Sequence, residues 1–301
     1  MNGRLGTMIA QRIPLSWRQW RWRWQKRQEA ARVRRIFDAA PDQPRWLDAA
    51  ELERLNQEFT RPYHYGYDQD NLIRRGEARS QELAALIADF RNCQDFLELA
   101  CHDGMVSSAL ASQGKRAVAT DVSDSGFNEA AKRAGVLFSR EDAMKLTFPD
   151  ESFDVVFSFD GMPHIPDPGK ALEEATRVTR RGQYIFMRLG SHYSAPFALH
   201  AYKSIFVPYC QFLFTRETMQ DYLAQRNLKP LDFESINHWH LSDFRALWRR
   251  FSDRLEILHL QETPELNSIG LVGRYPSCFK GKVPGFEDLT VSRFEVLFRK
   301  K

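Results

Sequence analysis

The chain has 301 residues, of which 43% are hydrophobic and 27% charged, as in ordinary globular proteins large enough for one large core or two small ones. Its net charge of +4 is uneven: residues 1–35 hold ten basic residues and one acid, so this arm carries +9 and the remainder carries −5. The net charge of −5 on residues 36–301 argues against a long groove there that binds the phosphates of a nucleic acid.

The basic arm, residues 1–40, is predicted to form a helix. Pro14 suits a first helical turn, and "QKRQEAARVRR" is rich in helix formers. On such a helix Ile13 and Ala31 share one face with three of the arm's four tryptophans, Trp17, Trp20 and Trp24. Three interpretations stay open: the stripe docks on the protein or a second subunit, residues 14–35 lie on an anionic membrane surface, or the arm binds nucleic acid, which the negative remainder disfavours.

Cysteine usage and hydropathy predict a cytoplasmic protein with reduced thiols. Membrane association stays open because of the basic arm. The four cysteines form no CxxC pair, so neither a disulfide framework nor a metal site is expected. No apolar run approaches the roughly 18 residues of a spanning helix, and the start lacks the apolar region of a secretory signal.

Residues 41–90 are predicted to form a helical cap over the site. The segment ends in "GEARSQELAALIADF", where apolar residues recur at helical spacing, and is interrupted by "RPYHYGYD". Tyr65 in this interruption is a candidate acceptor contact.

Residues 91–190 alternate short apolar runs with helical stretches, which predicts a parallel sheet with helices on both faces. The expected strands are "DFLELA", "RAVATDV", "GVLFSR", "FDVVFSF" and "QYIFMRL". Residues 191–301 break this rhythm with aromatic loops, helices near 215–226 and 241–251, and a final strand, "LTVSRFEVLF". We expect them to complete the sheet and build the acceptor site.

Chemistry-bearing residues follow successive predicted strands. "FLELACHDGMVSSAL" reads as strand, turn and helix, with Glu98 near the strand end and Gly104 opening the helix. Asp121 closes the second strand, and Asp142 follows the third. Such residues meet at the carboxyl edge of a parallel sheet, where nucleotide-like ligands bind.

In this order the segments resemble class I S-adenosylmethionine (SAM)-dependent methyltransferases of the small-molecule type, over roughly residues 94–190. The resemblance implies an α/β, Rossmann-like, mostly parallel sheet of seven strands, with the last strand antiparallel. It also implies SAM as cofactor, no metal, and these cofactor contacts: Glu98, Ala100, His102, Gly104, Asp121, Val122, Asp142, Ala143, Phe159 and Asp160.

The main departure is "ELACHDG", which has Ala100 and His102 where the family has glycines. A non-catalytic SAM-binding or scaffold protein is therefore an alternative, as is an RNA methyltransferase that uses the arm. A nicotinamide oxidoreductase is disfavoured because the third glycine of a dinucleotide turn is missing.

The acceptor is expected to be a small or lipid-linked molecule, with a sugar among the candidates, methylated at oxygen. The loop after the fourth strand lacks the motif of adenine and glutamine methyltransferases, and the lack of a Pro-Cys pair argues against cytosine methylation. A hydroxyl or other protonated acceptor needs a base, and the loops after the fourth and fifth strands supply His164, His192 and His200. "SHYSAPFALHAYKSIFVPYCQFLF" suits an acceptor pocket, with Tyr193 and Tyr202 as contacts. Its style resembles methyltransferases of glycan and lipid-glycan assembly. Whether the protein is a homo-oligomer stays open.

Overall fold

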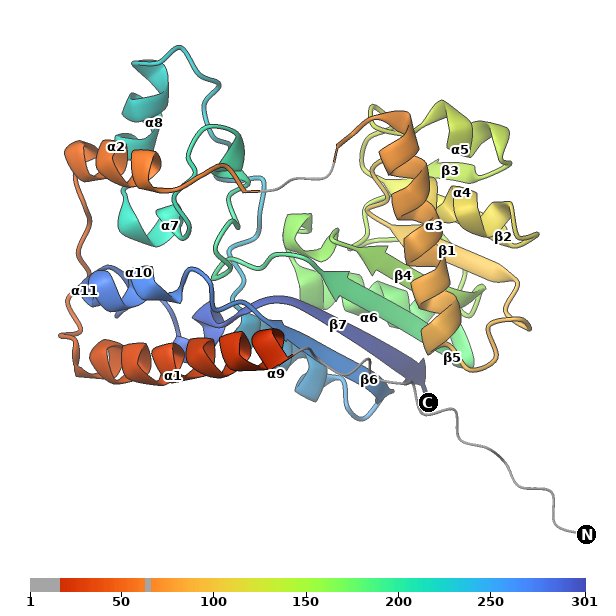
Figure 1. Cartoon of the computed structure of the whole chain (residues 1–301). Helices are drawn as coiled ribbons and strands as arrows, with labels where there is room; N and C mark the ends of the chain where they lie inside the picture. The colour runs from red at the N-terminus through yellow and green to blue at the C-terminus, as the bar shows by residue number, and fades with distance from the viewer. Residues whose placement is uncertain (1–16, 63–65) are drawn as a thin grey trace, which may run out of the picture.

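The computed structural model describes residues 17–62 and 66–301, which form two adjoining lobes (Figure 1). One lobe holds the β-sheet with its flanking helices. The other, which we call the helical lobe, is assembled from three separate stretches of the chain. Among the described residues, no helix is long and apolar enough to cross a membrane.

The sheet has seven strands in the order β3-β2-β1-β4-β5-β7-β6, and β7 runs antiparallel to both of its neighbours. This confirms the predicted fold class. The strands are β1 (Asp95–Leu99), β2 (Arg116–Asp121), β3 (Leu137–Arg140), β4 (Phe153–Phe159), β5 (Thr179–Leu189), β6 (Leu255–Pro264) and β7 (Val291–Lys300).

Helices cover both faces of the sheet, as predicted. Leu172 of α6 (Pro168–Val178) and Phe244 of α9 (Leu241–Arg250) pack on one face. Leu83 of α3 (Gln69–Leu86) and Val106 of α4 (Met105–Ala111) pack on the other. The short α5 (Glu129–Arg133) contributes Ala131 to a smaller cluster beside β2.

The helical lobe has its own apolar core, built of aliphatic and aromatic side chains. Its helices are α1 (Trp17–Ala39), α2 (Ala49–Glu58), α7 (Cys210–Leu213), α8 (Arg216–Ala224), α10 (Ile269–Arg274) and α11 (Pro276–Phe279), with the 3-10 turns η2 (Ala201–Lys203) and η3 (Phe286–Leu289). The predicted cap, residues 41–90, is thus shared: α2 belongs to the helical lobe, whereas α3 packs beside α4 on the sheet.

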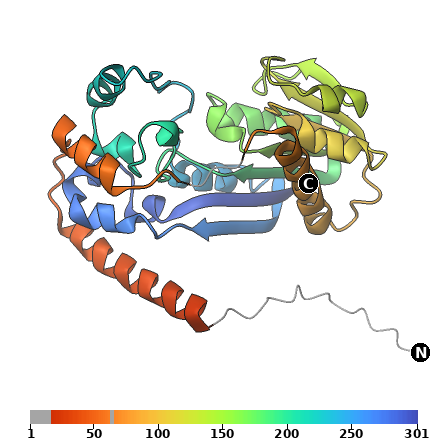
Figure 2. The same cartoon turned by 45° about the horizontal axis from the view of Figure 1, so that its top comes forward.

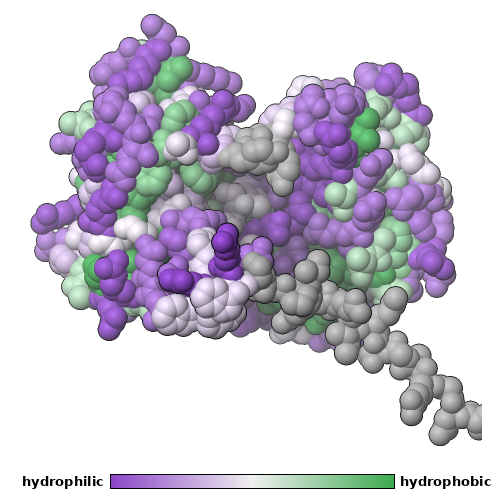
Figure 3. Space-filling view, viewed as in Figure 1, coloured by the Kyte–Doolittle hydropathy of each residue, from purple (hydrophilic) through white to green (hydrophobic). Residues whose placement is uncertain are grey.

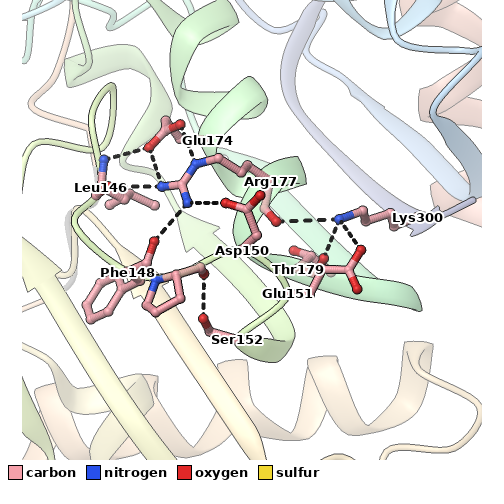
Figure 4. Close-up of polar contacts among 10 residues, drawn as sticks. Leu146, Phe148, Asp150, Glu151, Ser152, Glu174, Arg177, Thr179 and Lys300 are labelled. Carbon is pink, nitrogen blue, oxygen red and sulfur yellow. Dashed lines mark hydrogen bonds and ion pairs between the residues drawn. The ribbon is translucent and has the colours of Figure 1, made fainter.

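A polar network fixes the loop between β3 and β4 that carries Asp142 and Ala143 (Figure 4). Arg177 of α6 donates to the carbonyl oxygens of Leu146 and Phe148, at 2.9 and 2.8 Å. Its guanidinium also pairs with Asp150 and Glu174 at 2.8 Å. One half-buried helix residue, Arg177, therefore holds this loop in a single course along the sheet edge.

Candidate active site

The turn after β1 keeps a left-handed backbone at the three positions that correspond to the family glycines. Ala100, His102 and Gly104 have φ values of 52°, 51° and 67°. Gly104 has no alternative, since a Cβ there would lie 2.3 Å from the ring of Phe127. At the other two positions a residue with a side chain adopts this left-handed backbone conformation, which costs of order 1 kcal/mol or more. The turn therefore retains its shape despite the substitutions.

Asp121 lies at the carboxyl end of β2 and holds this turn in place. Its carboxylate accepts from the backbone N–H of His102 at 3.0 Å and of Ser123 at 3.2 Å. Val122 beside it is exposed. The next strand end supplies Asp142, which accepts from the N–H of Met144 at 2.9 Å, followed by the buried Ala143. Carboxylates at adjacent strand ends fit the ribose hydroxyls and the amino group of an adenosine.

Glu98 is buried within β1, behind the turn. Its carboxylate accepts from the N–H and the hydroxyl of Ser107, at 3.1 and 2.6 Å. Burial outweighs these bonds and raises the pKa of Glu98 from 4.5 to about 7. Ser107 was not anticipated from the sequence, although it lies in the helix that the turn begins.

Replacing Glu98 by glutamine should flatten the pH dependence of stability. The folded protein binds a proton at Glu98 more readily than the unfolded chain, so stability falls as pH rises from 4.5 to about 7. The loss is complete above that window and amounts to about 3 kcal/mol. Glu98→Gln should therefore raise the free energy of unfolding at pH 8, measured by urea denaturation across pH. Glu77→Gln, at an exposed site, is the control; parallel curves for wild type and Glu98→Gln would refute the assignment.

The end of β4 carries a charged cluster in which Asp160 was expected from the sequence but its charged partners were not. Asp160, at φ 62°, pairs with Arg79 of α3, and Arg188 of β5 lies 2.6 Å from Glu82. The two guanidinium groups lie 5.0 and 4.6 Å from the ring centroid of Phe159, in cation–π geometry. Burial lowers the pKa of Arg79 and raises that of Glu82. The signal in the sequence was the lone arginine in "QYIFMRL".

Replacing Arg188 by methionine should destabilise the protein by about 3 kcal/mol, because it leaves the carboxylate of Glu82 buried without its cation. The free energy of unfolding in guanidinium chloride measures this loss. Adding Glu82→Gln to Arg188→Met should restore part of the stability by removing the stranded charge. Equal stability of the single and double variants would contradict a net electrostatic role for the pair.

The structure brings two of the three candidate bases together. The rings of His164 and His200 lie 5.4 Å apart, and both residues are exposed. The Nδ1 atom of His164 is 2.6 Å from the carbonyl oxygen of Ser235. His192 instead lies in the interior, with Nε2 at 2.8 Å from the carbonyl oxygen of Val291, and burial lowers its pKa to about 4.

The candidate acceptor contacts lie in different surroundings. Tyr202 lies 6.0 Å from His200, and burial together with a hydrogen bond to Tyr67 raises its pKa to about 12. Tyr193 is half-buried against His238 and Phe212, at 4.5 and 5.4 Å. Tyr65 lies outside the described residues. A hollow between the two lobes is visible in the space-filling view (Figure 3).

The known proteins that this chain resembles are methyltransferases. Residues 97–187 match the family described as a methyltransferase domain. The chain is 28% identical over 143 residues to 27-O-demethylrifamycin SV methyltransferase of Amycolatopsis mediterranei, covering 44% of this chain and 53% of that protein. It is 31% identical over 152 residues to demethylmenaquinone methyltransferase of Clavibacter sepedonicus, covering 48% and 62%. It is 28% identical over 172 residues to O-methyltransferase resE of Aspergillus sclerotiorum, covering 53% and 64%.

The chain thus spans between half and two thirds of the length of these curated relatives. The matched residues run from β1 into β5 and include the strand ends described above. The seven-stranded sheet with its last strand, β7, antiparallel is what the sequence resemblance implied. Residues 97–187 thus match a methyltransferase-domain family, and the class I methyltransferases that this region resembles use S-adenosylmethionine as methyl donor.

Proposed function

We propose that this protein transfers a methyl group from SAM to a hydroxyl or carboxyl oxygen of a small molecule, with His164 as the base. The observation that carries the proposal is the contact between Nδ1 of His164 and the Ser235 carbonyl oxygen. A carbonyl oxygen can only accept, so Nδ1 holds the hydrogen and the lone pair is on Nε2. An exposed ring oriented in this way is suited to accept a proton.

When bound, SAM would supply an electrophilic methyl group, because its positively charged sulfur can leave as a neutral thioether. The O–H proton passes to Nε2 of His164 as the new C–O bond forms. Asp121 and Asp142 would hold the adenosine, while Glu98 and the Ala100–Gly104 turn would hold the methionine end. Val122, Ala143, Phe159 and Asp160 complete the proposed contacts, and the reacting groups gain from being held together.

The proposed acceptor site is the side of the hollow formed by residues 191–301. Tyr193, Tyr202 and His200 give it an aromatic character that suits a flat or cyclic acceptor. Relatives named for demethylmenaquinone and 27-O-demethylrifamycin, and one named as an O-methyltransferase, support a small-molecule acceptor. None of these three relatives is named for a glycan acceptor, so we do not propose one.

The test is methyl transfer from SAM labelled in its methyl group to a panel of phenols, hydroquinones and hydroxy acids. We expect label in one of these classes, released by conditions that cleave methyl ethers or esters. Saturable SAM binding by calorimetry without label in any class would favour the non-catalytic alternative. Label found only in RNA would favour the RNA methyltransferase instead.

A further inference from the structure

The first half of α1, Trp17–Arg27, has no role in the proposed site, although it holds four of the chain's seven tryptophans. We propose that this segment, which we call the tryptophan segment, binds the surface of an anionic lipid bilayer. The proposal does not depend on the methyl acceptor.

The second half of α1 is docked on the helical lobe. Val33 and Phe37 are buried, and the Phe37 ring lies 5.7 Å from that of Phe286. A Cβ on Gly273 of α10 would lie 3.0 Å from Val33, which shows how closely the two helices approach. Arg34 adds an ion pair with Glu287 at 2.8 Å. The helix is therefore held by one end.

The tryptophan segment extends from this anchor, and residues 28–62 and 66–301 leave it uncovered (Figure 2). Trp17, Trp20, Trp22 and Trp24 are 69%, 57%, 48% and 52% exposed. Single exposed apolar residues are ordinary, but Trp17, Trp20 and Trp24 lie on one face of the helix and form a patch, which typically marks a binding surface.

Three of the four tryptophans face away from the docked side of the helix. At 3.6 residues per turn, Trp17, Trp20 and Trp24 fall within about 60° of one another. The same geometry places Val33 and Phe37 roughly 150° from their mean direction. The helical lobe that binds the second half of α1 therefore cannot cover this stripe, and a partner must approach from outside.

Charge identifies the partner. Five basic residues and no acid lie in the tryptophan segment: Arg18, Arg21, Arg23, Lys26 and Arg27. Within the described part of the chain, only Lys26 has a carboxylate partner, Glu29 at 2.8 Å. Two copies of the segment would repel each other, which disfavours self-association through this face. Tryptophan settles at the headgroup level of a bilayer, and basic residues attract anionic headgroups. A nucleic acid is also anionic, but the rest of the protein, which carries −5, would repel it.

The test is co-sedimentation of the full chain with phosphatidylcholine vesicles, with and without phosphatidylglycerol, at low and high salt. We expect binding that requires phosphatidylglycerol and weakens with salt, with a blue shift of tryptophan fluorescence. The variant Trp17→Ala/Trp20→Ala/Trp24→Ala should bind on the order of a hundredfold more weakly. The variant Arg21→Ala/Arg23→Ala should lose about fivefold per charge.

Trp22→Ala is the matched control, since it removes the same side chain from a different face of the same segment. It should bind far more tightly than the triple variant, and all variants should keep the wild-type melting temperature because these side chains are exposed. Absent binding, equal binding to both vesicle types, or equal binding by the triple variant would overturn the proposal. Binding to single-stranded RNA at physiological salt that competes with vesicles would assign the segment to nucleic acid instead.

Discussion

Replacing His164 by glutamine should lower the turnover of methyl transfer by about 10²- to 10⁴-fold, the usual contribution of a general base. The amide cannot take up the acceptor proton, while the Ser235 carbonyl still finds an N–H donor in the glutamine side chain. The affinity for SAM should stay unchanged, because the proposed cofactor contacts lie on other residues. Turnover is measured with methyl-labelled SAM and calorimetry gives the SAM affinity.

Two further histidine variants make this result specific. His200→Gln removes the ring that lies 5.4 Å from His164 and should slow turnover less, because the base itself remains. His259→Gln, in β6 beside Glu295, lies on another part of the sheet and should retain wild-type turnover. If His200→Gln is the slower enzyme, the roles of the two rings are reversed. If neither variant is impaired, neither ring is the base.

Replacing Asp121 by alanine should raise the dissociation constant of SAM by about 10- to 100-fold. The variant loses the proposed contacts to the ribose hydroxyls, and it also frees the backbone N–H groups of His102 and Ser123 that shape the turn. Isothermal calorimetry measures the affinity, and the melting temperature of the unliganded protein separates lost contacts from lost structure.

Asp124→Ala is the control for Asp121→Ala, since it removes a carboxylate from the same loop outside the proposed contacts. Asp121→Asn keeps one oxygen that can accept from one of the two N–H groups, and it should lose less affinity than the alanine variant. Unchanged SAM binding in Asp121→Ala would remove this residue from the site. A large fall in melting temperature without a change in affinity would make its role structural.

The central strands β1 and β4 could be predicted because they are buried on both faces and therefore read as continuous apolar runs. β6 was missed for the opposite reason: it is an edge strand with mostly exposed side chains, "LEILHLQETP", and its partner β7 follows much later in the chain. The start of β5 was also missed, since the expected strand began only at "QYIFMRL". There the strand contains Gly182 at φ 76° and a register shift against β4.

The candidate site likewise contains residues that the sequence could predict and contacts that it could not. Asp121 and Asp142 could be placed because each follows a strand, and strand ends of a parallel sheet share an edge. The contact between Arg79 and Asp160 could not, because it depends on how α3 packs across the sheet. The orientation of His164 also needed the structure, since Ser235 reaches it from a separate segment.

The composition of the helical lobe has a consequence for synthesis of the protein. Val33 and Phe37 are translated more than 200 residues before Gly273 and Phe286, their partners in α10 and η3. Until those partners are made, the apolar face of α1 lacks them, and contacts this distant in sequence form slowly. During that interval the docked face and the tryptophans are exposed together, so we expect the nascent chain to need chaperone protection until α10 and η3 have been made.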